Sequence, residues 1–143
     1  MNSLPCRCLP ILISLLLVGC GAEPVDLQPS IAIIYGSVRD ADDTPVSGAT
    51  VAIHALPLDR CDEQEGWLAV TTTTDPAGTY RGVGAYVHVA EETLCLAVRV
   101  RPPASTSLGE AVVTGDTVTF IHESRTPPVD SVRVDVMLPA AGA

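Results

Sequence analysis

Histidines, cysteines and one histidine–glutamate pair are the side chains of this chain that could bind a metal or act as nucleophiles. His54, His88 and His122 fall on separate predicted elements, so their spacing does not indicate a shared metal site. No Ser-His-Asp or Cys-His arrangement is recognisable, and the aspartates of residues 40–43 do not match the spacing of a calcium-binding loop. We therefore predict no catalytic residue, no metal and no cofactor, and we expect the chain not to be an enzyme.

An apolar run over residues 9–18 leads into Gly19 and Cys20. The run is shorter than the roughly 20 residues that a membrane span needs, which is typical of a secretory leader. The residues Leu17-Val18-Gly19-Cys20 resemble the lipobox of bacterial lipoproteins. The resemblance implies cleavage before Cys20, acylation of that cysteine with palmitate or a similar chain, and anchoring to a membrane of the cell envelope, with the outer membrane favoured if the host has one. An ordinary signal peptide is the alternative.

The remaining cysteines predict a disulfide. Cys6 and Cys8 would leave with the leader and Cys20 would carry the lipid, so that Cys61 and Cys95 remain. An even number of cysteines in an exported chain favours pairing, and two buried free thiols are the alternative. A bond between them would close a loop of roughly 35 residues and stabilise the fold by about 3 to 4 kcal/mol on the chain-entropy model.

Charge excludes one class of partner. The chain has 8 basic residues, all of them arginine, against 17 carboxylates, and its formal net charge is −9. Affinity for nucleic acid comes from cations that neutralise phosphates, so nucleic acid is not expected as a partner. The length of 143 residues, less the leader, corresponds to one domain.

Strand signals recur along the rest of the chain, and no segment has sustained helical periodicity. The predicted strands cover residues 31–39, 49–56, 67–74, 79–84 and onward, 93–101, 111–121 and 131–138. About seven short strands at even spacing favour an all-β, immunoglobulin-like or prealbumin-like sandwich of two packed sheets. The predicted organisation is a signal peptide, a tether, the sandwich and a short tail, over residues 1–19, 20–30, 31–139 and 140–143 respectively.

Alternation within two of these strands makes further predictions. In residues 93–101, Cys95 faces away from the apolar side, so a bond to Cys61 would hold the acidic loop of residues 57–66 over the outer surface of the sheet. Residues 111–121 form either one strand with a bulge at Gly115-Asp116 or a tight hairpin about those two residues, and alternation does not decide between the two.

Three ordered motifs carry a resemblance to a known family. They are Gly36-Ser37-Val38-Arg39-Asp40, then Thr44-Pro45-Val46-Ser47-Gly48-Ala49-Thr50-Val51, then Thr74-Asp75-Pro76-Ala77-Gly78-Thr79-Tyr80. Together they resemble the carboxypeptidase regulatory-like (transthyretin-like) domain over residues 34–138. The resemblance implies a seven-stranded prealbumin-like sandwich that usually serves as a non-catalytic accessory, spacer or binding module.

Two shorter matches to enzymes do not predict catalysis. His88 and Glu91 are similar to the H-x-x-E zinc pair of metallocarboxypeptidases, but the large catalytic domain of those enzymes is missing. Tyr80-Arg81-Gly82 resembles the Y-R-G-S ending of transthyretin-like hydroxyisourate hydrolases, but that motif belongs at the C-terminus, where this chain has other residues.

Three functional hypotheses follow. The first is a non-enzymatic, lipid-anchored envelope module for interaction with an envelope protein or for structural support. The second is a module that binds carbohydrate or another small ligand, with contacts from Trp67, Tyr80 or Tyr86. The third is a small transthyretin-like hydrolase, which requires the histidines, Arg81 and a carboxylate to converge.

Overall fold

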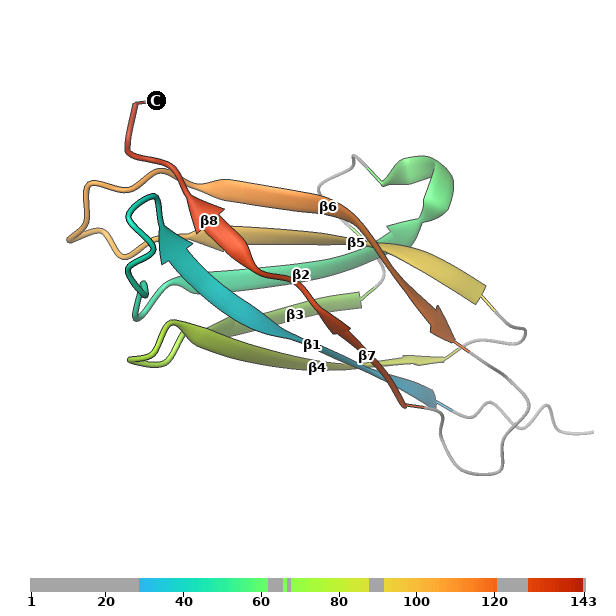
Figure 1. Ribbon diagram of the computed structural model, residues 1–143. Coiled ribbons are helices and arrows are strands. Elements are labelled where there is room, and N and C mark those ends of the chain that lie inside the picture. Colours follow the sequence, from blue (N-terminus) through green and yellow to red (C-terminus); the bar gives the residue numbers. More distant parts are fainter. Residues whose placement is uncertain (1–28, 62–65, 67, 88–91, 121–128, 143) are drawn as a thin grey trace, which may run out of the picture.

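The chain folds as a sandwich of one mixed and one antiparallel sheet (Figure 1). The computed structural model describes residues 29–61, 66, 68–87, 92–120 and 129–142. The first sheet has the order β4-β1-β7, with β8 also paired to β1, and comprises β1 (Pro29–Asp40), β4 (Thr79–Val87), β7 (Val129–Arg133) and β8 (Val136–Leu138). The second sheet has the order β3-β2-β5-β6 and comprises β2 (Thr50–Pro57), β3 (Leu68–Thr73), β5 (Glu92–Arg101) and β6 (Ala111–Phe120). The predicted all-β sandwich is confirmed.

Alternation of apolar side chains builds the core between the sheets. In β1 every second residue from Ala32 to Val38 is buried, while the residues between them are partly or largely exposed. β2 repeats the pattern with Val51, Ile53 and Ala55 inside. The fully buried side chains with the largest volume are all aliphatic, namely Ile34, Ile53, Leu56, Leu94, Leu96, Leu138, Val38, Val51, Val98, Val100 and Val118.

The turn between β3 and β4 connects one sheet to the other. Its Asp75 accepts hydrogen bonds from the backbone N–H groups of Ala77 (2.9 Å) and Thr79 (2.8 Å) and from the Thr79 hydroxyl (2.6 Å). Gly78 takes a φ of +75°, which glycine adopts without steric cost. The hydrogen bonds from Thr79 hold the pKa of Asp75 below its ordinary value. The hydrogen bonds of Asp75 and the backbone conformation of Gly78 therefore explain why aspartate, glycine and threonine occur at these positions of the turn.

β6 is a single bulged strand, which settles the alternative that alternation left open. The pairing with β5 passes from Ala97↔Thr114 to Cys95↔Thr117, so β6 contains one residue more than β5 over this interval. Gly115 lies inside the interval with a φ of +113°. The extra residue at this point produces a β-bulge rather than a hairpin.

The last predicted strand is divided into β7 and β8, both parallel to β1. β7 pairs through Tyr35↔Arg133 and β8 resumes at Val38↔Val136, so the register is the same before and after the interruption. The two residues between them, Val134 and Asp135, leave the ladder. This interruption shapes the surface described below.

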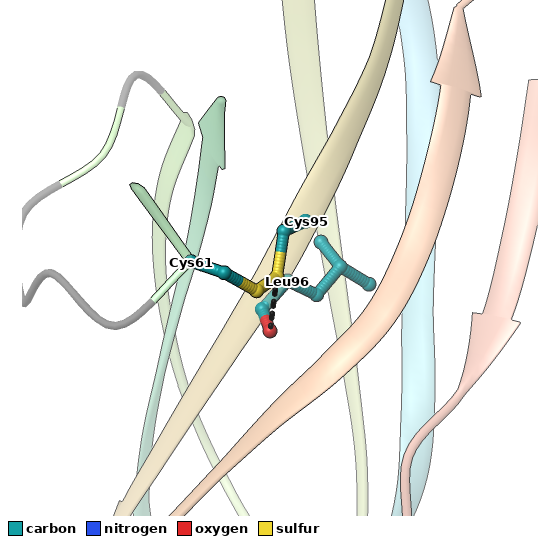
Figure 2. Close-up of a disulfide and its surroundings, with 3 residues drawn as sticks. All are labelled: Cys61, Cys95 and Leu96. Carbon is teal, nitrogen blue, oxygen red and sulfur yellow. Dashed lines mark hydrogen bonds between the residues drawn. A yellow bond between two sulfur atoms is a disulfide. The ribbon is translucent and has the colours of Figure 1, made fainter. Parts of the chain in front are cut away.

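Cys61 and Cys95 form the disulfide that the cysteine count predicts (Figure 2). Their Cα atoms are 5.6 Å apart. Cys61 directly follows a short 3-10 helix, η1 (Leu58–Arg60), in the segment that was expected to be a loop, and η1 packs against β5 (Figure 1). Cys95 is 1% exposed. The bond therefore fixes the chain after β2 to the middle of the second sheet.

Candidate functional site

Three side chains lie in register across the outer face of the first sheet. Tyr35 of β1 is opposite Arg81 of β4 on one side and opposite Arg133 of β7 on the other. Tyr35 is 42% exposed, and the side chain of Arg133 is 63% exposed. The three residues line a hollow of about 600 Å³, here called the outer-face pocket, together with Ile33, Gly36, Ser37, Thr79 and Tyr80.

Strand alternation explains why this row faces outward. Because Ile34 and Gly36 are buried in β1, Tyr35 between them must project from the opposite face. The same parity applies in β4, where Tyr80 and Gly82 are buried and Arg81 is exposed. Arg81 in the antiparallel neighbour β4 and Arg133 in the parallel neighbour β7 both pair with Tyr35, so the three residues form one row across the sheet.

Gly36 and Tyr80 hold the wall of the pocket at the break between β7 and β8. The N–H of Val134 donates to the Tyr35 carbonyl (2.8 Å), and the Tyr80 hydroxyl donates to the Val134 carbonyl (2.6 Å). A Cβ on Gly36 would overlap that carbonyl oxygen, so only glycine allows the close approach. Burial raises the pKa of Tyr80, which keeps this phenol a neutral hydrogen-bond donor.

Asp135 anchors one of the two arginines. One carboxylate oxygen accepts hydrogen bonds from the backbone N–H and the hydroxyl of Ser37 (2.8 and 2.9 Å), and the other lies 2.9 Å from the Nε of Arg133. Partial burial raises the pKa of Asp135, but the hydrogen bonds from Ser37 and Arg133 outweigh this effect and keep the pKa below its ordinary value. The carboxylate is therefore ionised at neutral pH and orients Arg133.

A smaller hollow of about 320 Å³ adjoins the outer-face pocket and shares Ser37 and Arg133 with it. Arg39 lies in its wall and donates to the Asp43 carbonyl (2.7 Å), with its guanidinium 3.5 Å from the Asp43 carboxylate. Arg81 has no carboxylate within ion-pair distance among the described residues. The two hollows are thus lined by three arginines and two carboxylates, in a chain whose net charge is −9.

Of the residues singled out from the sequence, Tyr80 and Arg81 line this pocket. Tyr80 contributes to its wall but is 4% exposed and bound to the backbone. Trp67, His88, Glu91, His122 and Cys20 lie outside the described residues, as does the side chain of Tyr86. His54 lies in β2, on the other sheet. Whether the remaining aromatic residues contact a ligand stays a prediction.

Among the described residues, no three histidine, cysteine, aspartate or glutamate side chains are placed to hold a metal ion. The Nδ1 of His54 is buried and has no hydrogen-bond partner there, but among the described residues His54 belongs to no group of three metal-ligating side chains. Within the residues that the structure describes, no helix has the length and apolar character needed to cross a bilayer.

Tyr35 and Arg133 were not recognised as site residues from the sequence. A signal for them was present, since the run Ile31-Ala32-Ile33-Ile34-Tyr35 is apolar on both faces of a predicted strand. A strand with one face in the core normally has a polar second face. An apolar second face indicates a surface with some further use.

No protein-family model matches this chain, and no curated protein is similar to it in sequence. Its fold does resemble solved structures. Hydroxyquinol 1,2-dioxygenase from Pseudomonas putida DLL-E4 superimposes with a TM-score of 0.50 at 13% identity, over 81% of this chain and 58% of that one. 3-Chlorocatechol 1,2-dioxygenase from Rhodococcus opacus 1CP gives a TM-score of 0.50 at 9% identity, over 80% and 62%. This chain therefore spans about three fifths of their length, and the likeness establishes the sandwich fold alone.

These structures correct the resemblance inferred from the three turn motifs. The expectation of a carboxypeptidase regulatory-like domain is wrong, because the similar structures are catechol and hydroxyquinol dioxygenases. The physical reason is visible in the motifs themselves. Asp75, Gly78 and Asp40 make local turn hydrogen bonds, which many sandwiches use and which do not specify how distant strands pair.

The functional predictions tied to that resemblance are overturned with it. They described a non-enzymatic envelope module, with a carbohydrate-binding module and a small transthyretin-like hydrolase as alternatives, whereas the similar structures are oxygen-using enzymes of another kind. The description as a palmitate-carrying lipoprotein also finds no support in them, although the β-sandwich and a disulfide do hold. Envelope localisation, a membrane or envelope-protein partner and the absence of nucleic-acid binding stay predictions.

Proposed function

We propose that this protein is an enzyme that acts on a small aromatic diol of the catechol class and binds it in the outer-face pocket. The observation that carries the proposal is the in-register row of Arg81, Tyr35 and Arg133 inside a hollow of about 600 Å³. A hollow of this size falls within the range of small-molecule sites.

The lining of the pocket suits a planar hydroxylated ring. The exposed ring of Tyr35 and the side chain of Ile33 offer apolar contact area, and the guanidinium of Arg81 offers hydrogen-bond donors. The hydroxyls of Ser37 and Thr79 are already engaged by Asp135 and Asp75. Recognition of a diol would therefore depend on Arg81, Arg133 and the Tyr35 hydroxyl.

The arginines would also alter the acidity of such a substrate. A positive charge close to a phenolic hydroxyl stabilises the phenolate and lowers its pKa. Catecholate is more electron-rich than catechol, so the pocket would hold the substrate in its more easily oxidised form. The similar sandwiches of hydroxyquinol and chlorocatechol dioxygenases support this substrate class by analogy of fold.

A dioxygenase reaction needs a group that can activate oxygen, for which proteins use iron, copper, haem or flavin. The described residues do not fit a metal of this kind, because no group of three metal-ligating His, Cys, Asp or Glu side chains is present among them. We derive no oxygen step from this pocket. The proposal assigns to the described residues the binding and orientation of the aromatic diol.

The test uses the full chain with its disulfide intact, before and after supplementation with ferrous or ferric iron. Catechol, hydroxyquinol and 3-chlorocatechol are titrated by isothermal calorimetry, and their consumption is followed together with oxygen uptake. Saturable binding and consumption of at least one diol are expected, and Arg81→Gln should weaken both. Failure of all three diols to bind and to react, with and without iron, would overturn the proposal.

A further inference from the structure

Arg81 and Arg133 are paired with Tyr35 from opposite sides and line the outer-face pocket with it, and most of their N–H donors have no acceptor among the described residues. Arg133 uses its Nε on Asp135, which leaves four of its five N–H donors for another partner. The guanidinium of Arg81 has no hydrogen bond or ion pair to another described residue. The row of Arg81, Tyr35 and Arg133 therefore has more N–H donors and more positive charge than the described acceptors and carboxylates around it can pair with.

The register fixes how these groups can act together. Neighbouring strands lie about 4.8 Å apart, so the Cα atoms of Arg81 and Arg133 are about 10 Å apart with Tyr35 midway between them. A ligand ring placed on Tyr35 would thus have a guanidinium on each side. Guanidinium is planar and binds oxyanions in a bidentate manner, and it also stacks on aromatic faces.

The anchoring of Arg133 is the second observation. Asp135 is held by two hydrogen bonds from Ser37 and in turn holds Arg133 at 2.9 Å. A charged side chain that is oriented in advance loses less conformational freedom when it binds, which favours specific recognition over loose screening.

We propose that Arg81 and Arg133 recognise an oxyanion on an aromatic ring that stacks on Tyr35, so that the ligand is an aromatic carboxylate, sulfonate or phosphate. The inference rests on the proposed function in one respect, namely that the outer-face pocket binds an aromatic ring. A neutral diol supplies hydrogen-bond acceptors for only some of the N–H donors of Arg81 and Arg133. An oxyanion bonded to the ring matches both the positive charge of the two guanidinium groups and the geometry of their donors.

The experiment measures binding to the full, disulfide-bonded chain at low ionic strength, where charge recognition is least screened. The probes are benzoate, benzenesulfonate and phenyl phosphate, with benzyl alcohol as a ring without charge and acetate as a charge without a ring. At least one aromatic oxyanion is expected to bind about tenfold or more tightly than either control probe, since hydrogen bonds to charged groups are the strong ones. The order among the three identifies the oxyanion.

Matched variants separate the pocket from general charge. Arg81→Gln and Arg133→Gln should each weaken the best oxyanion about tenfold. Arg101→Gln removes the same charge from the other sheet and should leave binding unchanged. Tyr35→Phe keeps the ring and should retain affinity, whereas Tyr35→Ser should lose it. Circular dichroism and the melting temperature of each variant show whether it is folded.

The outcomes distinguish this inference from the proposed function. Equal affinity for benzoate and benzyl alcohol, or equal losses in Arg81→Gln and Arg101→Gln, would refute oxyanion recognition. If catechol is bound and consumed while no oxyanion is preferred, the proposed function stands and this inference fails. Binding of an oxyanion that depends on Arg81, without any reaction of a diol, supports the inference and removes the catechol assignment.

Discussion

The outer faces of the two sheets use the same residue type in opposite ways. On the second sheet, Arg99 and Arg101 both lie near Glu110, at 3.6 and 3.7 Å, so one carboxylate serves two arginines. On the first sheet, Arg133 has Asp135, but Arg81 has no described carboxylate and a tyrosine ring lies between them. The number of arginines on a face therefore does not locate a site. A site is located by the arginines whose N–H donors lack acceptors. On the first sheet, Arg81 and Arg133 have more N–H donors than the described residues accept, and both line the outer-face pocket.

The two sheets also differ in how they are held together. The second is linked through the Cys61–Cys95 disulfide to η1, whereas the first depends on close packing of Val134 against Gly36 and on the Tyr80 hydroxyl.

Removal of the disulfide should have the largest effect on stability. Cys61 and Cys95 are 34 residues apart, and the variant Cys61→Ala/Cys95→Ala should lose about 3 to 4 kcal/mol of unfolding free energy on the chain-entropy model. Urea unfolding measures the loss, with reduced wild type as the comparison. Ligand binding by the folded fraction should persist because the bond lies on the other sheet. Loss of binding in the folded variant would contradict the separation of the two faces.

Gly36→Ala should destabilise the first sheet and disturb the pocket together. Its methyl group would overlap the Val134 carbonyl, so the backbone of β1 or of the break must move, at a cost of about 3 kcal/mol. The control is Gly109→Ala, whose methyl would lie 3.2 Å from Pro139 Cγ and 3.4 Å from the Ala140 carbonyl, a milder crowding. Thermal unfolding and probe binding are measured for both. Similar behaviour of the two variants would argue against a special role for the break.

Glu110→Gln converts the second sheet into a face with unpaired arginines. Exposed ion pairs contribute little, so the expected change in stability is below about 1 kcal/mol. The variant should still bind the aromatic oxyanions on the first sheet, which the substitution does not touch. It should gain no second site, because no aromatic ring lies between Arg99 and Arg101. NMR shift changes locate the bound probe. Strong binding at Arg99 and Arg101 in this variant would show that charge alone suffices.

Asp135→Asn should weaken recognition on the first sheet by a small amount. It removes the carboxylate that orients Arg133, and oxyanion affinity should fall about two- to threefold, as expected for a partly exposed ion pair. Calorimetric titration of the variant and of wild type measures the ratio. Tighter binding would mean that loss of the competing negative charge outweighs the orientation of Arg133 by Asp135.

The same variant gives a pH dependence. Because the pKa of Asp135 in the folded state lies below its ordinary value of 3.8, its ionisation adds stability that is present above that value and lost as the pH falls through the folded pKa. Wild type should therefore lose more stability than Asp135→Asn below about pH 4. Melting temperatures from pH 7 down to pH 2.5 test this. Asp42→Asn, a loop carboxylate without a described hydrogen bond to its oxygens, should follow the wild-type curve.

Most of the fold could be predicted from the sequence, because local patterns encode it. Alternation in residues 93–101 and in residues 49–56 identifies β5 and β2 within a residue or so of their bounds. The bulge at Gly115 and the division of the last strand could not be assigned, since each depends on the register with a neighbouring strand. η1 was missed because three residues carry no periodicity.

The candidate site was harder to predict because its residues come from three strands far apart in the chain. Tyr35, Arg81 and Arg133 have no fixed spacing in the sequence and share no motif. The family resemblance misled for the same reason, since its motifs record turns such as Asp75 to Thr79, whereas the pocket arises from strand order.

An all-β chain with an aliphatic core and one pairing of Cys61 with Cys95 follows from the order of the amino acids, because side-chain alternation, turn residues and cysteine parity are local or countable properties. The position of β1 between β4 and β7 does not follow from these properties and is seen only in the folded chain. That strand order places two arginines beside one tyrosine ring, and it is set by the burial of both sheets against a common core, which no local pattern contains.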